Sequence, residues 1–112
     1  MIEIRISKFL LKDFKKYLSK PQQEDIINRI NSFKDNFNQG KLITQIGLIQ
    51  LKEIKLNKFR IYFLIDKNII KVVKKEEVES IIKFISISTK KNQQKIINKI
   101  KENLRDFGFD FY

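Results

Sequence analysis

The chain opens with alternating apolar and charged residues and then changes to a helical spacing. Residues 2–6 read IEIRI, and strict alternation of this kind is typical of a strand with one buried face. Ser7 is a residue type that caps helices. In residues 8–18, four apolar or aromatic side chains fall near one helical face: Leu10, Phe14, Tyr17 and Leu18. The pattern predicts a strand followed by an amphipathic helix.

A second helix is predicted after a short break at residues 19–21, SKP. Pro21 suits the first turn of a helix, where a backbone N–H is not needed. Residues 21–37 carry apolar side chains at spacings of three and four: Ile26, Ile27, Ile30, Phe33 and Phe37. Because few residues separate the two helices, we expect them to form an antiparallel hairpin.

The middle of the chain alternates again and predicts strands joined by tight turns. We expect strands over residues 42–56, 59–65, 69–73 and 81–88. Asn57-Lys58 and residues 66–68 are the predicted turns. The polar residues 74–80, KKEEVES, predict an exposed connection.

The alternation slips once inside the strand predicted over residues 42–56. Leu51 falls on one parity and Ile54 on the other. A β-bulge near Lys52 and Glu53 would bring both apolar side chains to the same face, so we predict a bulge there.

The last predicted element is a helix from about Lys90 to Phe107. Ser88 or Thr89 is placed to cap it, and Gly108 is placed to end it. Its apolar stripe consists of Ile96, Ile97, Ile100, Leu104 and Phe107.

Together these elements predict an α+β fold in a single domain over residues 1–112. An N-terminal strand and a helical hairpin pack on a twisted antiparallel sheet of about four strands, and a C-terminal helix follows. We expect the helices to cover the apolar face of the sheet and the other face to be partly open and basic.

The composition removes several kinds of chemistry. The chain has no Cys and no His, which excludes disulfides, Cys-based zinc sites and a histidine base. We expect no metal and no cofactor. Charges interrupt the apolar N-terminal segment, and no stretch approaches the ~18 uncharged apolar residues of a membrane span. We therefore expect a cytoplasmic protein that contacts no membrane.

The net charge of +11 favours a polyanionic partner, although the abundance of Ile, Lys and Asn accounts for part of it. Lys55 and Arg60 are predicted to face each other across the hairpin, with Tyr62 on the same side. Like charges in such positions repel, so the pair favours a bound anion such as phosphate. The alternative is a solvated face of a Lys-rich chain, with Glu53 as a partner of a neighbouring Lys.

Two further segments are candidates for nucleic-acid contact. Lys90, Lys91 and Lys95 lie in the first turns of the last predicted helix, where cations oppose the helix dipole unless an anion binds there. The alternative is a solvated helix start. The tail contains Phe107, Phe109, Phe111 and Tyr112. We favour core packing for this tail over a partner-binding arm or a base-stacking group.

Three segments resemble the RelE/ParE superfamily of type II toxins, most closely its HigB-like, or addiction module killer, branch. FLLKDFKKYLSKPQQEDIINRI resembles the opening helical hairpin. EIKLNKFRIYFLI resembles the pattern Glu-Leu-Arg-Ile, a turn, then aromatic-Arg-hydrophobic-Tyr. IIKFISISTKKNQQKIINKIKENLRDF resembles the closing strand and helix. The resemblance implies ribosome-dependent mRNA cleavage or poisoning of DNA gyrase, and neutralisation by a cognate antitoxin.

The resemblance also implies site residues. Arg60 matches the Arg after the aromatic residue, and Lys55 takes the place of the Arg in Glu-Leu-Arg. The implied catalytic residues are Arg60, Lys55, Lys52 and Tyr62, and the implied RNA-binding residues are Lys90, Lys91, Lys95 and Tyr112. The chain departs from the family in having no His near its C-terminus and in a longer segment over residues 66–80.

The implied chemistry is attack of an RNA 2′-OH on the adjacent phosphate. We predict Arg60 on that phosphate, Lys55 or Lys52 as base or second clamp, and Lys91 on the flanking backbone. Three functions stay open: an mRNA endoribonuclease that acts on the ribosome, a gyrase inhibitor without nuclease chemistry, and a basic RNA- or protein-binding domain.

Overall fold

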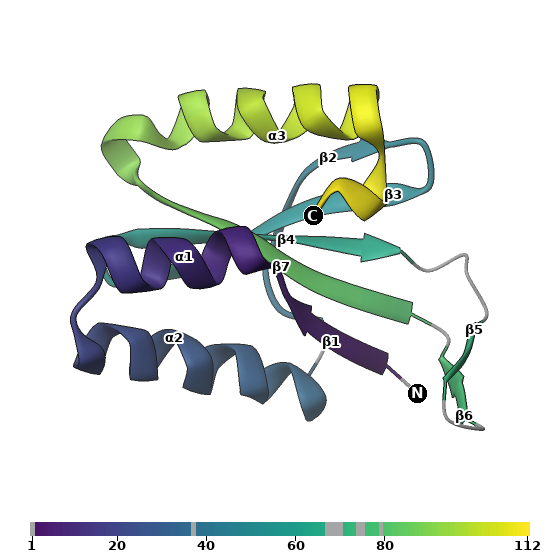
Figure 1. Ribbon diagram of the computed structural model, residues 1–112, viewed down its shortest axis with the longest axis horizontal. Helices are drawn as coiled ribbons and strands as arrows, with labels where there is room; N and C mark the ends of the chain where they lie inside the picture. The colour runs from purple at the N-terminus through teal and green to yellow at the C-terminus, as the bar shows by residue number, and fades with distance from the viewer. Residues whose placement is uncertain (1, 37, 67–70, 74–75, 79) are drawn as a thin grey trace.

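The N-terminal strand and helical hairpin form as the sequence predicts. The computed structural model describes residues 2–36, 38–66, 71–73, 76–78 and 80–112. Strand β1 spans Ile2–Ile6, and helices α1 (Lys8–Tyr17) and α2 (Lys20–Asn31) lie antiparallel (Figure 1). Helix α2 is shorter than predicted, because the chain tightens into a 3₁₀ turn at Ser32–Lys34. Phe37 lies outside the described residues.

Two serines start these helices. Ser7 Oγ accepts a hydrogen bond from the Phe9 N–H at 3.1 Å. Ser19 and Gln22 form a reciprocal capping box, in which the Ser19 N–H donates to Gln22 Oε1 at 2.9 Å and the Gln22 N–H donates to Ser19 Oγ at 3.3 Å. Because these bonds satisfy donors that the first helical turn leaves open, local sequence specifies where each helix begins.

The described residues form a five-stranded sheet in the order β1-β7-β4-β3-β2. Its other strands are β2 (Lys41–Ile46), β3 (Ile49–Leu56), β4 (Phe59–Asp66) and β7 (Ser80–Thr89). Strand β1 runs parallel to β7, and the remaining pairs are antiparallel. The single strand predicted over residues 42–56 is two strands, because Gly47, with a φ of 59°, turns the chain after Ile46.

The segment over residues 66–80 contributes a second, two-stranded sheet. Strands β5 (Lys71–Val73) and β6 (Glu76–Val78) pair antiparallel. Residues 67–70, 74–75 and 79, which belong to the turn and connection predicted here, lie outside the described residues.

Helix α3 spans Gln93–Phe107 and follows a 3₁₀ turn at Lys90–Asn92. It ends at Gly108, as predicted, where a φ of 78° suits glycine and the N–H donates to Leu104 O at 3.0 Å. A final 3₁₀ turn covers Phe109–Phe111. Figure 1 shows α3 on one side of the sheet and the helical hairpin on the other.

Helices therefore cover both faces of the sheet, and the predicted open basic face is wrong over much of its area. Buried residues of α1, α2 and the sheet form one core, which includes Leu10, Phe14, Ile26, Ile30, Ile61 and Phe63. Buried residues of α3 and the opposite face form a second core, which includes Tyr62, Leu64, Ile85, Ile97, Ile100 and Leu104. The apolar stripe of α3 buries itself against this second face.

The change of alternation between Leu51 and Ile54 in β3 does not come from the predicted bulge. Strand β3 pairs with β4 without interruption along its whole length. Leu51 packs in the core beneath α3, whereas Ile54 packs in the core beneath the helical hairpin. Because both faces are covered, apolar residues of opposite parity are both buried and no bulge is needed in β3.

Register shifts occur instead in β2, between Leu42 and Thr44, and in the pairing of β4 with β7. In β7 the extra residue is Ile85. Phe84 and Ile87 stand three residues apart, and the bulge lets both pack against the core of the helical hairpin.

Candidate functional site

An open groove of about 540 Å³ gathers basic side chains at one end of β3 and β4. The residues of this basic groove that carry polar groups are Arg29, Lys41, Glu53, Lys55, Arg60 and Gln93. The pairing of β2 with β3 ends at Lys41 and Glu53, so within the described part of the chain the last residues of β3 have no neighbouring strand on that side. The groove therefore wraps around an open sheet edge.

The β3–β4 hairpin positions the two central cations. Asn57 adopts a φ of 55° and turns the chain tightly, as predicted, so that Lys55 pairs directly opposite Arg60. Side chains in such positions have Cβ atoms about 5 Å apart. Lys55 is exposed and Arg60 half-buried, and neither forms an ion pair with another described residue. Two adjacent cations without an acidic partner are arranged to bind an anion.

Glu53 supplies a carboxylate within the same groove. Its Oε2 accepts a hydrogen bond from Gln93 Nε2 at 3.0 Å, a contact between β3 and the first residue of α3. It lies two residues before Lys55 on the strand and is therefore on the same face. From the sequence, Glu53 was predicted only as an ion-pair partner of a neighbouring Lys. Its shared parity with Lys55 was the available sign that it lies in the groove. The contact with Gln93 could not be read from the local pattern, because the two residues are forty positions apart.

Tyr62 supports the groove from below. Its side chain is 0% exposed, and its hydroxyl lies 2.7 Å from Ser88 Oγ. Burial raises the pKa of Tyr62, the hydrogen bond to Ser88 opposes that rise, and the nearby Glu53 carboxylate adds to it. The predicted catalytic role does not fit this position, because a fully buried side chain cannot touch a substrate in the groove.

Lys52 lies on the other face of the sheet from Arg60. It pairs with Phe63, which belongs to the core of the helical hairpin, whereas Arg60 pairs with Lys55 on the α3 face. The two predicted alternatives for a second cation are thus separated by the sheet, and Lys55 alone is beside Arg60.

The three predicted lysines near α3 are exposed. Lys90 and Lys91 lie in the 3₁₀ turn, which is fixed by a bond from the Thr89 N–H to Asn92 Oδ1 at 2.8 Å. This turn leads directly into Gln93, so the lysines are adjacent in the chain to a residue of the basic groove.

Tyr112 lies at the opposite end of α3. The helix has 15 residues and is about 22 Å long, and Tyr112 follows its C-terminal end. Its hydroxyl accepts from Asn103 Nδ2 at 3.0 Å, and its ring contacts Phe9 and Phe111. Burial raises the pKa of Tyr112, and the bond from Asn103 opposes the rise. The structure does not bring Tyr112 together with Arg60.

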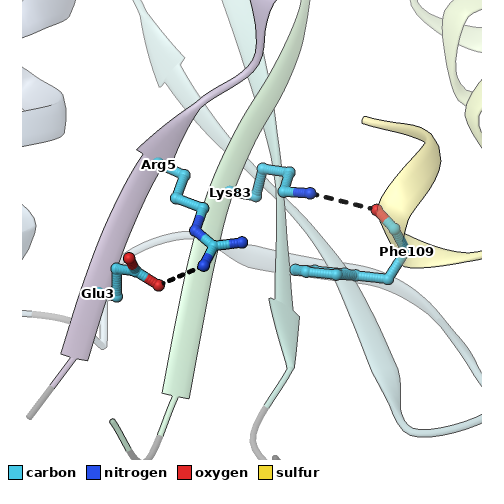
Figure 2. A network of polar contacts seen from close by, with 4 residues as sticks. All are labelled: Glu3, Arg5, Lys83 and Phe109. Carbon is cyan, nitrogen blue, oxygen red and sulfur yellow. Dashed lines mark hydrogen bonds and ion pairs between the residues drawn. The ribbon is translucent and has the colours of Figure 1, made fainter. Parts of the chain in front are cut away.

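Lys83 contacts the C-terminal turn, beside an ion pair on the neighbouring strand β1 (Figure 2). Lys83 is 7% exposed, and its Nζ lies 3.4 Å from Phe109 O and 4.4 Å from the centre of the Phe109 ring. On the neighbouring strand, Arg5 pairs in register with Lys83 and forms an ion pair with Glu3 at 2.8 Å. This buried cation contacts Phe109, which is packed as the sequence favoured, whereas Phe107, predicted in the apolar stripe and the packed tail, is 66% exposed.

No group of three or more metal-binding side chains occurs within the described part of the chain. No helix among the residues that the structure describes is both long and apolar enough to span a membrane. Comparisons with protein families, with curated proteins and with solved structures found no match for this chain.

Proposed function

We propose that this protein is the toxin of a type II toxin–antitoxin system and cuts mRNA on the ribosome. The observation that carries the proposal is the basic groove, in which Lys55 and Arg60 face each other, form no ion pair with another described residue and have Glu53 on the same face. The order of strand, helical hairpin, sheet and C-terminal helix agrees with the RelE-like arrangement implied by the sequence, although many α+β proteins share it.

A nucleic-acid backbone is the anion that suits this groove. Arg29, Lys41, Lys55 and Arg60 provide four cations along one hollow, and the whole chain carries a net charge of +11. Guanidinium groups match two phosphate oxygens at once, and ammonium groups act as compact point charges. The groove is open, so an extended single strand has access to it.

The chemistry needs no metal. The Glu53 carboxylate accepts the proton of the RNA 2′-OH, and the 2′ oxygen attacks the adjacent phosphorus. Arg60 stabilises the charge that builds on the phosphate oxygens. The bond to the 5′ oxygen breaks, and Lys55 donates a proton to that leaving oxygen. The products are a 2′,3′-cyclic phosphate and a 5′-hydroxyl end. Gln93 orients the carboxylate, and Lys90, Lys91 and Lys95 contact flanking phosphates.

The positive charge of the basic groove also supports the proposed partners. The toxin acts in the cytoplasm on ribosome-bound mRNA, and a cognate antitoxin neutralises it. An acidic antitoxin segment that occupies the basic groove would compete with mRNA for the same cations.

The test is primer extension on a reporter mRNA after the purified protein is added to a translating extract. We expect new 5′ ends with the wild type and at least 100-fold fewer with Arg60→Ala, because the lost guanidinium acts on the transition state. Arg105→Ala removes the same charge from an exposed position in the last turn of α3 and is the matched control. It should cut like the wild type.

Other outcomes would contradict the proposal. Intact mRNA together with loss of gyrase supercoiling activity would identify a gyrase inhibitor. Intact mRNA with normal supercoiling would leave a basic binding domain. Equal cutting by Arg60→Ala and Arg105→Ala would remove the basic groove as the active site.

A further inference from the structure

A second hollow, of about 470 Å³, lies at the free edge of β7. Strand β1 pairs with residues 80–84 of β7, so among the described residues the later part of β7 has no strand beside it on that side. Residues from α1, α2, the β3–β4 turn and the 3₁₀ turn that leads into α3 complete the walls. The edge hollow is lined by Asp13, Tyr17, Gln22, Phe59, Thr89 and Asn92, among others. Its volume falls in the range of ~300–1,000 Å³ typical of small-ligand pockets.

We propose that the edge hollow binds a nucleobase of the RNA strand whose phosphate lies in the basic groove, and that it prefers guanine. The inference rests on the proposed function, because it assigns a base-recognition subsite to the same substrate.

The aromatic residues of the hollow are suited to stacking. Tyr17 is the last residue of α1 and is 65% exposed, although its helical spacing predicted a place on the apolar face with Leu10 and Phe14. Lys16 Nζ lies 5.2 Å from the centre of the Tyr17 ring, and Lys58 Nζ lies 5.4 Å from the centre of the Phe59 ring. Rings that stack on bases beside cations that hold phosphates are the usual elements of single-strand recognition.

Asp13 gives the hollow a preference among bases. It is half-buried, and it forms no hydrogen bond with another described residue. Burial raises the pKa of Asp13, and Lys16 and Lys12 oppose that rise. An ionised carboxylate only accepts hydrogen bonds. Guanine presents two adjacent donors, N1–H and N2–H, to its two oxygens. Uracil presents one donor between two carbonyl oxygens, which the carboxylate repels.

The hollow and the basic groove lie within reach of neighbouring nucleotides. Phe59 lines the hollow and Arg60 the groove; they are consecutive in β4 and therefore point to opposite faces at the same end of that strand. Arg60 also pairs in register with Ser88, which lines the hollow. At the start of α3, Asn92 lines the hollow and Gln93 lines the groove. Because adjacent strands lie about 4.8 Å apart, an RNA strand that crosses the end of β4 reaches both.

The test measures binding of RNA octamers by fluorescence anisotropy. Every 2′-OH is methylated to block cleavage, and the octamers are all uridine or uridine with one central guanine, adenine or cytosine. We expect the wild type to bind the guanine octamer at least 5-fold more tightly than all-uridine. Tyr17→Ala should weaken binding of every octamer about 10-fold through lost stacking, and Asp13→Asn should abolish the guanine preference.

Two controls isolate the hollow. Leu11→Ala truncates an apolar residue of α1 that is 42% exposed and does not line the hollow, and it should bind normally. As the second comparison, Tyr17→Phe keeps the ring and should recover the binding that Tyr17→Ala loses. Tyr17→Ala that binds like Leu11→Ala, or a guanine preference that survives Asp13→Asn, would overturn the inference.

The failure of this inference is distinct from the failure of the proposed function. If Arg60→Ala abolishes binding while the Tyr17 and Asp13 variants behave like the wild type, the basic groove binds RNA and the hollow does not. If the wild-type protein binds no octamer and cuts no mRNA, the proposed function fails and the hollow has no RNA to recognise.

Discussion

Tyr62→Phe separates a supporting role for Tyr62 from a catalytic one. The substitution removes one hydroxyl from a side chain that is 0% exposed, and it leaves Ser88, which is 4% exposed, without the partner that lies 2.7 Å from its Oγ. Leaving a buried hydroxyl unpaired costs about 1–2 kcal/mol of folding free energy. Unfolding entropy is about 2.1 cal/mol/K per residue, so 112 residues give a Tm shift of about 4 °C per kcal/mol.

We therefore expect Tyr62→Phe to lower Tm by about 4–8 °C at pH 7, measured by circular dichroism. The double variant Tyr62→Phe/Ser88→Ala removes both hydroxyls and should recover part of the loss, because no unpaired group remains. Cleavage per folded molecule should stay within about twofold of the wild type, since the ring keeps its place beneath the basic groove.

The pH dependence of stability gives an independent check. Because the folded-state pKa of Tyr62 is raised above the usual value near 10, the neutral form is favoured in the folded protein. The contribution of neutral Tyr62 to folding stability is fully present below about pH 10 and is lost as the pH rises through the folded-state pKa. Tyr62→Phe should therefore lose less stability than the wild type above pH 10. A large loss of cleavage with an unchanged Tm would refute the argument and make Tyr62 a catalytic group.

Two further substitutions test the backbone of the basic groove and the acid of the edge hollow. Gly40→Ala would place a Cβ 2.8 Å from Phe63 Cζ and 2.9 Å from Glu53 O, and it would strain a backbone with a φ of +95°. We expect the free energy of unfolding, measured with urea, to fall by about 1–3 kcal/mol. Gly47→Ala, with a φ of +59° and nothing within 4 Å, should lose only about 1 kcal/mol, and equal losses would contradict the steric argument. Asp13→Asn should raise Tm at pH 7. Because burial raises the pKa of Asp13 in the folded protein, its ionised carboxylate destabilises the fold at pH values above the unfolded-state pKa of 3.8. Thermal unfolding should show this gain shrinking toward pH 3, and a gain independent of pH would contradict it.

Short-range features of this protein were predictable from the sequence. Ser7 and Ser19 start α1 and α2, and Gly108 ends α3, because capping involves residues only a few positions apart. The turn at Asn57-Lys58 likewise determines which residues of β3 and β4 face each other. The opposition of Lys55 and Arg60 follows from that turn and from the two-residue period of a strand.

The features that the sequence did not reveal depend on packing between distant segments. An amphipathic stripe shows that α3 buries one side, but it does not say which sheet face receives that side. Docking of α3 on the second face buries Tyr62, closes most of the predicted open surface and brings Gln93 to Glu53. The sheet also separates Lys52 from Arg60, since neighbouring parities point to opposite faces. Local hydrogen bonds thus define the elements and the central cation pair, whereas long-range burial of apolar surface assembles the rest of the basic groove and the edge hollow.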